Sequence, residues 1–262
     1  MSFITLLTDF GIRDGAVGLM KGVIWRIAPE AKIADLSHTI APQNLQEAAV
    51  VLRFGAPYFP PNTVHIVVVD PGVGTHRRPI AARLGDYYFV GPDNGVFTPL
   101  LEMAQAAGGP IEIVHTNKPA YWLPEVSQVF HGRDIFSPVG AHLAAGVRLA
   151  DLGTPIDDPI VLALPQPQPM ENGWRGEVIF IDDFGNIHTN LLRQHLQPLG
   201  EVRVRLCGVE IEGMVRTFGE RPIDTLIALY GTEHDLIVSV VNGNATQRLQ
   251  TRVGDVVEVI GR

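Results

Sequence analysis

The N-terminal part of the chain alternates short apolar runs with longer amphipathic segments. Four runs are rich in β-branched and aromatic residues, which predicts buried strands. These runs are Phe3–Leu7, Lys32–Ala34, Val64–Val69 and Tyr87–Val90. Apolar residues recur at helical spacing in the segments between and after them, which predicts helices over residues 18–28, 45–54, 96–107 and 138–145. Strands that alternate with helices need crossover connections, so we expect an α/β domain with a mainly parallel sheet.

The pattern changes after residue 164. Three prolines occur within residues 165–169, which favours an extended linker there. Beyond this linker, short stretches of alternating polar and apolar residues predict the strands of a small all-β, barrel-like domain. These stretches are Gly176–Ile181, Glu201–Cys207, Val209–Met214, Leu226–Tyr230, Leu236–Val241 and Asp255–Ile260. We therefore expect an α/β domain over residues 1–164 and a β domain over residues 170–262.

Composition excludes several classes of protein. The 262 residues are 46% hydrophobic and 18% charged, which is enough apolar material for a sizeable core. The formal net charge of −8 argues against nucleic-acid binding, which needs a basic patch. No run reaches the roughly 18 apolar residues of a membrane span, and no secretory signal is visible, so we expect no membrane partner and a cytoplasmic location. The single cysteine, Cys207, excludes an internal disulfide.

Aspartates follow several of the predicted strands. Asp9 and Asp70 stand directly after strands of the first domain, and Asp182 stands after the first strand of the second domain. A single aspartate at a strand end is ordinary turn chemistry. Because open α/β sheets bind ligands beyond the carboxyl ends of their strands, the repetition indicates a shared polar rim around a ligand.

Other familiar sites are poorly supported by the sequence. The chain contains no G-x-x-x-x-G-K-[ST] phosphate loop, and Gly72-Val73-Gly74 starts a dinucleotide motif whose third glycine is replaced by Arg77. No paired metal-ligand spacing such as H-E-x-x-H occurs. We therefore expect neither a metal nor a cofactor.

Five motifs occur in an order and spacing that resemble one known family. They are Thr8–Gly11 with Asp14, Asp70–Gly74, Gly91–Gly95, Phe130–Asp134 and Phe184–Asn190. Together they resemble the S-adenosyl-L-methionine (SAM) hydroxide adenosyltransferase family, whose relatives include fluorinases and chlorinases. The resemblance implies that water or hydroxide displaces methionine from C5′ of SAM, which gives adenosine and methionine. It also implies a homotrimer with its sites between neighbouring subunits.

The resemblance places the catalytic group on Asp70, Arg77 and His131. Arg77 can hold the carboxylate of Asp70 in a charge-assisted pair, and an ion-paired carboxylate is a weak base. A histidine has an ordinary pKa of about 6.5, so His131 is the better proton acceptor near neutrality. The sequence leaves open which of the two takes the proton. The neighbouring Arg78 is expected to face solvent.

Five further residues carry over as substrate contacts. The carboxylate of Asp9 has two acceptor oxygens and can bind both hydroxyls of a ribose. Asp14 and Asp182 are candidates for the methionine ammonium group. Phe184 is expected to stack on the purine, and Asn186 offers a donor and an acceptor to the adenine edge.

The match weakens toward the C-terminus. Thr232 preserves a hydroxyl, and Val240 can offer backbone groups to adenine. Ile237 stands where the family has a glutamate, and Ala16 stands where a halogenase relative has a hydroxyl residue. Two alternatives therefore stay open beside hydrolysis. One is halogenation at C5′, and the other is a non-catalytic sensor that binds SAM or adenosine.

Overall fold

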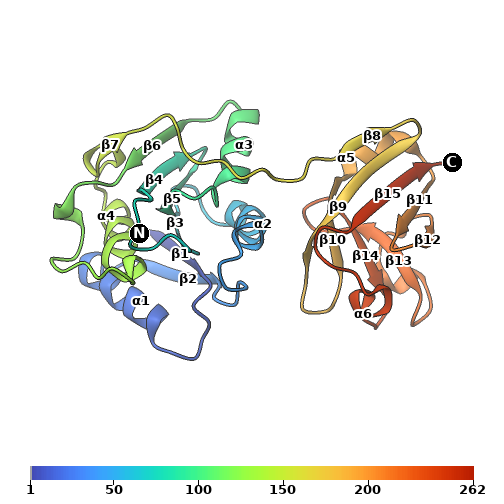
Figure 1. Ribbon diagram of the computed structural model, residues 1–262, viewed down its shortest axis with the longest axis horizontal. Coiled ribbons are helices and arrows are strands. Elements are labelled where there is room, and N and C mark those ends of the chain that lie inside the picture. The colour runs from blue at the N-terminus through green and yellow to red at the C-terminus, as the bar shows by residue number, and fades with distance from the viewer. Residues whose placement is uncertain (1) are drawn as a thin grey trace. The chain divides into compact units, whose positions relative to one another are not determined.

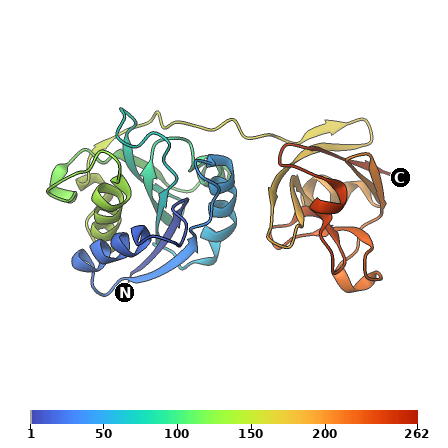
Figure 2. The same ribbon diagram turned by 60° about the horizontal axis from the view of Figure 1, so that its bottom comes forward.

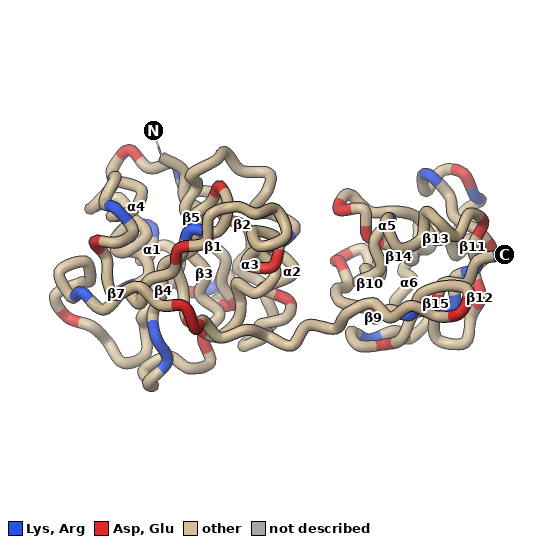
Figure 3. The backbone as a smooth tube through the Cα atoms, turned by 90° about the horizontal axis from the view of Figure 1, so that it is seen from above, with Lys and Arg blue, Asp and Glu red and all other residues tan. Residues whose placement is uncertain are grey.

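The computed structural model describes residues 2–262, which form two compact units (Figure 1). The first unit ends at Leu162 and the second runs from Ala163 to Arg262. Each unit has its own sheet and its own hydrophobic core. Lysine and arginine are interspersed with aspartate and glutamate along the backbone of both units (Figure 3). Among the helices of residues 2–262, none has the length and apolar character needed to cross a membrane.

A seven-stranded sheet forms the centre of the first unit. In spatial order its strands are β2 (Lys32–Ser37), β1 (Phe3–Thr8), β3 (Val64–Val68), β5 (Tyr87–Pro92), β4 (Pro79–Leu84), β6 (Ile111–His115) and β7 (Thr154–Pro155). Strand β3 lies near the middle, and all five of its residues are buried. The continuous β-branched run that predicted this strand therefore reflects a strand covered on both faces.

The expectation of a mainly parallel sheet is wrong, because the sheet is mixed. Strands β2, β1, β3 and β5 pair in parallel, whereas β4 pairs antiparallel with β5 and β6, and β6 pairs antiparallel with β7. The cause is a hairpin in which Gly85 and Asp86 alone connect β4 to β5, with Gly85 at φ +62°. A two-residue turn with a left-handed glycine forces antiparallel pairing, and Gly85-Asp86 is the sequence signal for this turn.

Helices cover both faces of this sheet (Figure 2). Helices α1 (Ala16–Ile27) and α4 (Ser137–Ala144) pack on one face, and α2 (Leu45–Gly55) and α3 (Thr98–Ala106) pack on the other. Successive residues of β3 alternate between the two cores: Ile66 and Val68 belong to the α1 side, whereas Val67 belongs to the α2 side. All four helices lie within two residues of their predicted bounds.

Several helical turns are shorter than these four helices. Single 3₁₀ turns cover Ala56–Tyr58, Pro119–Tyr121, Leu149–Asp151, Gln197–Leu199 and Phe218–Glu220. A π-helical turn covers Gly132–Phe136 and runs directly into α4. Such π turns are rare in proteins, and those that do occur are frequently found at functional sites.

The second unit is an antiparallel, barrel-like sheet. Its strands are β8 (Gln168–Met170), β9 (Gly173–Ile181), β10 (Ile187–Leu192), β11 (Val202–Leu206), β12 (Val209–Glu212), β13 (Leu226–Tyr230), β14 (Asp235–Val240) and β15 (Val256–Gly261). The spatial order is β12-β11-β15-β9-β10-β14-β13, and β8 pairs with β9. The edge strands β12 and β13 contact each other, which nearly closes the sheet. Short helices α5 (Arg193–Leu196) and α6 (Ala245–Leu249) complete the unit.

A buried histidine lies inside the first unit. His65 on β3 has no exposed surface, and its Nδ1 lies 2.7 Å from the hydroxyl of Thr5. Its ring stacks on Phe89 with the centroids 5.1 Å apart, and its Nε2 has no hydrogen-bond partner among the described residues. Burial lowers the pKa of His65 to about 3, so the folded protein keeps this ring neutral.

We predict that His65 makes stability depend on pH in the acid range. The folded pKa of about 3 lies below the ordinary value of 6.5, so between these values only the unfolded chain takes up the proton. The contribution is therefore complete above pH 6.5 and is lost as the pH falls toward 3, by up to about 1.4 kcal/mol per pH unit. In urea denaturation at several pH values, the free energy of unfolding of His65→Gln should depend less steeply on pH, by the slope that corresponds to uptake of one proton. The same substitution at the exposed His76 is the matched control, and identical slopes for His65→Gln and wild type would contradict the prediction.

Candidate active site

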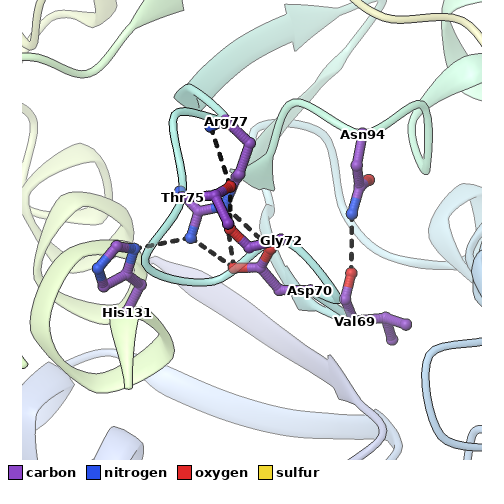
Figure 4. Close-up of polar contacts among 7 residues, drawn as sticks. All are labelled: Val69, Asp70, Gly72, Thr75, Arg77, Asn94 and His131. Atoms are coloured by element: carbon purple, nitrogen blue, oxygen red, sulfur yellow. Dashed lines mark hydrogen bonds and ion pairs between the residues drawn. The ribbon is translucent and has the colours of Figure 1, made fainter. Parts of the chain in front are cut away.

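Asp70, Arg77 and His131 form one connected group at the carboxyl end of β3 (Figure 4). The Nε of Arg77 donates to Asp70 Oδ1 at 2.9 Å, and its Nη2 donates to the second carboxylate oxygen, Oδ2. The same Nη2 donates to Nδ1 of His131 at 2.7 Å. The side chains of Arg77 and Asp70 are only 8% and 5% exposed. Arg77 therefore links the carboxylate to the imidazole.

The turn between Asp70 and Arg77 is fixed by its own hydrogen bonds. The backbone N–H of Val73 donates to the carbonyl of Asp70 at 3.2 Å, and the hydroxyl of Thr75 donates to the carbonyl of Gly72 at 2.6 Å. A Cβ at Gly72 would lie 3.1 Å from the side chain of Arg77. The glycine therefore lets the arginine side chain fold back over the turn toward the carboxylate.

The contact with Arg77 decides which nitrogen of His131 carries the proton. A guanidinium only donates, so Nδ1 of the neutral ring must accept and the ring proton sits on Nε2. Burial, followed by the charge of Arg77, lowers the pKa of His131 below 6.5, while Asp70 and Asp134 act in the opposite direction. The basic lone pair of the neutral ring thus faces Arg77, and Nε2–H is a hydrogen-bond donor.

His131 is positioned by the π-helical turn that follows it. Within this turn, Asp134 is fully buried and accepts from the backbone N–H of Ser127 at 2.8 Å and from Nε of Arg133 at 2.6 Å. Its own carbonyl accepts from the backbone N–H of Leu123 at 2.9 Å. Asp134 therefore ties the loop that leads to His131 to the helix that leaves it.

The arginine turn and the histidine loop contact each other directly. Gly74 has φ +75°, and a Cβ built on it would lie 2.3 Å from the carbonyl oxygen of Gln128. A side chain at position 74 would separate the two segments that carry Arg77 and His131. The Asp-Pro-Gly-Val-Gly motif therefore needs its second glycine for close backbone approach as well as for its φ angle.

Of the two other N-terminal candidates, one lies beside this group. Asp9 follows β1, and its Oδ2 accepts from the backbone N–H of Gln43 at 2.8 Å. The adjacent Phe10 packs edge-on against Phe130, with ring centroids 5.6 Å apart, so the Asp9 loop borders the histidine loop. Asp14 lies in an exposed loop, where its carboxylate accepts from the backbone N–H of Ala16 at the start of α1.

The Gly91–Gly95 motif supports the site without entering the contact group. The Nδ2 of Asn94 donates to the carbonyl of Val69 at 2.9 Å, which holds the end of the strand segment that carries Asp70 (Figure 4). Asp93 is buried and pairs with Arg78, whose Nη1 also donates to Asp158 at 2.7 Å. The expectation that Arg78 simply faces solvent is wrong, because it anchors the segment that ends the first unit.

The remaining candidates line a cavity of about 840 Å³ in the second unit. They are Asp182, Phe184, Asn186, Thr232 and Val240. The ring of Phe184 is 78% exposed, as expected for an aromatic side chain that stacks on a planar ligand. Asn186 donates from Nδ2 to Asp182 at 2.7 Å and accepts at Oδ1 from the hydroxyl of Ser239, so each amide atom already has one partner in the chain.

One residue of this region was missed by sequence reasoning. His188 lines the same cavity, and Nδ1 of its ring lies 2.7 Å from the carboxylate of the buried Asp235. His188 lies inside the Phe184–Asn190 motif, so the motif was found but this residue was not singled out. Ile237, which replaces a glutamate of the family pattern, also lines the cavity.

An α/β unit with an Asp–Arg–His group, followed by an antiparallel β unit with a cavity of small-molecule size, defines a class of two-domain enzymes. The chain belongs to the SAM hydroxide adenosyltransferase family. The model of the family's N-terminal domain matches residues 4–153, and the model of its C-terminal domain matches residues 176–258.

Individual relatives agree with this family. The (R)-S-adenosyl-L-methionine hydrolase of Salinispora tropica is 38% identical over 97% of this chain and 95% of its own length. A solved structure of an uncharacterised conserved protein from Thermotoga maritima is 36% identical, with a TM-score of 0.91 over 98% of this chain and 99% of that one. A fluorinase of an Actinoplanes species is more distant, at 29% identity over 79% of this chain and 78% of its own.

We predict that Gly74→Ala destabilises the protein more than Gly85→Ala does. Both glycines have positive φ values, at +75° and +62°, but a Cβ at Gly85 meets nothing within 4 Å. Gly85→Ala should therefore cost only the left-handed backbone term of about 1–2 kcal/mol. Gly74→Ala should cost about 1–3 kcal/mol more, because its Cβ collides with the Gln128 carbonyl. Chemical denaturation measures both losses, and equal values would show that the two segments do not depend on this contact.

Proposed function

We propose that this protein hydrolyses SAM to adenosine and L-methionine through attack of water on C5′. The observation that carries the proposal is the single guanidinium that contacts both the carboxylate of Asp70 and the imidazole of His131. The side chains of Asp70 and Arg77 are buried, His131 is half-buried, and the group lies where α/β sheets place their ligands. Relatives that are 34–38% identical over nearly the whole chain carry the name of this hydrolase.

The chemistry makes modest demands on the protein. A water oxygen bonds to C5′ while the C5′–S bond breaks, and the electron pair of that bond goes to sulfur. Methionine then leaves as a neutral thioether, so no acid is needed to protonate it. The sulfonium loses its charge as the C5′–S bond breaks, and a carboxylate that takes the proton of water loses its own charge. Opposite charges are thus neutralised, which a poorly solvated pocket favours. The protein must hold one water in line and accept its proton.

The geometry divides these tasks among three side chains. Nε2–H of His131 donates to the water oxygen, which leaves a lone pair of that oxygen for attack. Asp70 keeps lone pairs beyond those that face Arg77. Although this pairing makes it a weak base, Asp70 can accept the proton of the water, because the oxygen becomes strongly acidic as it bonds to C5′. Arg77 fixes both partners and its charge favours the developing hydroxide. This assignment gives the proton to Asp70 and replaces the sequence-based preference for His131, since Nδ1 of His131 is already occupied by Arg77.

The substrate contacts follow from position. We assign Asp9 to the ribose hydroxyls, Phe184 and Asn186 to the adenine ring, and Asp182 to the methionine ammonium group. Asp182 is preferred over Asp14, because it lines the cavity whereas Asp14 lies in an exposed loop and accepts from the backbone N–H of Ala16. Thr232 and Val240 add a hydroxyl and backbone groups to the cavity wall.

The family resemblance also supports a homotrimer with its sites between subunits, in the cytoplasm. The catalytic group belongs to the first unit and the cavity to the second.

Halogenation at C5′ is the second candidate, because fluorinases are among the relatives. The hydrolase relatives share more identity and cover more of the chain, which favours water as the nucleophile. Chloride or fluoride added to the reaction should leave adenosine as the nucleoside product. A 5′-halogenated nucleoside would favour the halogenase, whereas tight binding without turnover would favour a sensor.

We predict that the protein, treated with a chelator, releases adenosine and methionine from SAM. In water that is half oxygen-18, about half of the adenosine should carry the label on its 5′ oxygen, because the nucleophile comes from solvent. Chromatography with mass detection measures both products. Label-free adenosine, or intact SAM, would contradict attack of water at C5′.

We predict that His131→Gln retains far more activity than His131→Ala. Glutamine can still accept from Arg77 and donate to water, so the loss should stay within about tenfold, the equivalent of one weakened hydrogen bond. A residue that takes the proton contributes about 100- to 10,000-fold, and glutamine cannot replace it in that role. Equal losses in kcat for the two variants would therefore return the proton acceptor role to His131.

The pH profile provides an independent readout of the same assignment. The pKa of His131 lies below 6.5, so the ring stays neutral through that pH. Protonation at lower pH would remove the acceptor for Arg77 and bring two cations together. The wild-type rate should therefore fall only below pH 6.5, and His131→Gln should lose the part of this fall that the ring causes.

A further inference from the structure

The cavity of the second unit contains a charged pair that the mechanism above does not use. His188 on β10 lines the cavity and is 15% exposed, whereas Asp235 on β14 lies behind it and is 2% exposed. Nδ1 of His188 lies 2.7 Å from Oδ2 of Asp235, and its Nε2 lies 3.9 Å from the carboxylate of Asp182. His188 thus stands between a buried carboxylate and a carboxylate of the cavity wall.

The charges of these three groups alternate when His188 is protonated. A carboxylate as deeply buried as Asp235 needs a donor, and an imidazolium supplies both a hydrogen bond and the opposite charge. The contact through Nδ1 directs Nε2–H away from Asp235. Among the described residues that line the cavity, His188 is the only one that can carry a positive charge, and Asp182 is the only acidic one.

We propose that His188 binds the α-carboxylate of the methionine part of SAM and selects for sulfonium substrates that carry this group. The inference rests on the proposed function, in which Asp182 binds the ammonium group on the same carbon atom. An α-amino acid presents opposite charges a few ångströms apart, and Asp182 and His188 present the complementary charges 3.9 Å apart. Asp235 is the positioning residue that orients the His188 ring and balances its charge.

The test compares SAM with its decarboxylated form, which keeps the sulfonium and the ammonium group but lacks the carboxylate. His188→Gln should lower kcat/KM for SAM by about 10- to 100-fold, the equivalent of one charge-assisted hydrogen bond, mainly through a higher KM. The value for decarboxylated SAM should change far less. Asp235→Asn should show the same selective pattern with a smaller loss, and it keeps the test available if His188→Gln fails to fold.

His234→Asn is the matched control. His234 is an exposed histidine next to Asp235 that does not line the cavity, and asparagine tolerates its left-handed φ of +61°. This variant should keep the wild-type ratio of the two substrates. Equal losses of His188→Gln on both substrates would reduce His188 to a structural role, and an unchanged preference would remove it from substrate recognition.

The inference and the proposed function fail in different ways. If wild type releases adenosine but His188→Gln keeps the full preference for SAM, only the inference is overturned. If wild type releases no adenosine, calorimetric binding of SAM and decarboxylated SAM still measures the preference for the carboxylate. A preference that His188→Gln abolishes in binding would support the inference for a protein that binds SAM without turnover.

Discussion

The first unit is organised around one buried guanidinium. Arg77 is 8% exposed, and burial of a charge in a protein interior costs free energy unless the charge is paired and hydrogen-bonded. Asp70 supplies the opposite charge, His131 supplies a further acceptor, and the ring of Phe136 lies 5.1 Å from the guanidinium carbon. The Asp-Pro-Gly-Val-Gly turn, the π-helical turn and the Gln128 contact all serve to bring these partners together. A change in any of them would leave a buried cation incompletely paired.

Much of the fold of the first unit could be predicted from the sequence, because the strand and helix patterns occur next to the family motifs. An unbroken β-branched run predicted β3, and the aspartate that follows it stands at the strand end as expected. The four helices of the first unit were equally readable from their apolar spacing. The antiparallel hairpin of β4 and β5 was overlooked, although Gly85 and Asp86 mark it, because the alternation of strands and helices dominated the interpretation.

Side-chain contacts over long sequence separations could not be predicted in the same way. Arg77 and His131 are 54 residues apart, and their contact depends on a π-helical turn. The spacing of apolar residues in a sequence does not predict such a turn. The motif at Gly91–Gly95 was noted only as part of the family resemblance, and in the structure its Asn94 holds the carbonyl of Val69 while its Asp93 accepts from the backbone N–H of Ile160. Motif membership does not distinguish residues that contact each other across the site from residues that stabilise the surrounding turns, because this distinction depends on the three-dimensional contacts.

His131 and His188 illustrate how a neighbour sets the chemistry of the same side chain. In His131, Nδ1 accepts from a guanidinium, so the ring is held neutral with its proton on Nε2. In His188, Nδ1 lies 2.7 Å from a buried carboxylate, so this nitrogen carries a proton and donates. The first arrangement suits the orientation of a water molecule, and the second suits the binding of an anionic group. Residue type alone does not distinguish these roles, since each depends on the charge placed behind the imidazole.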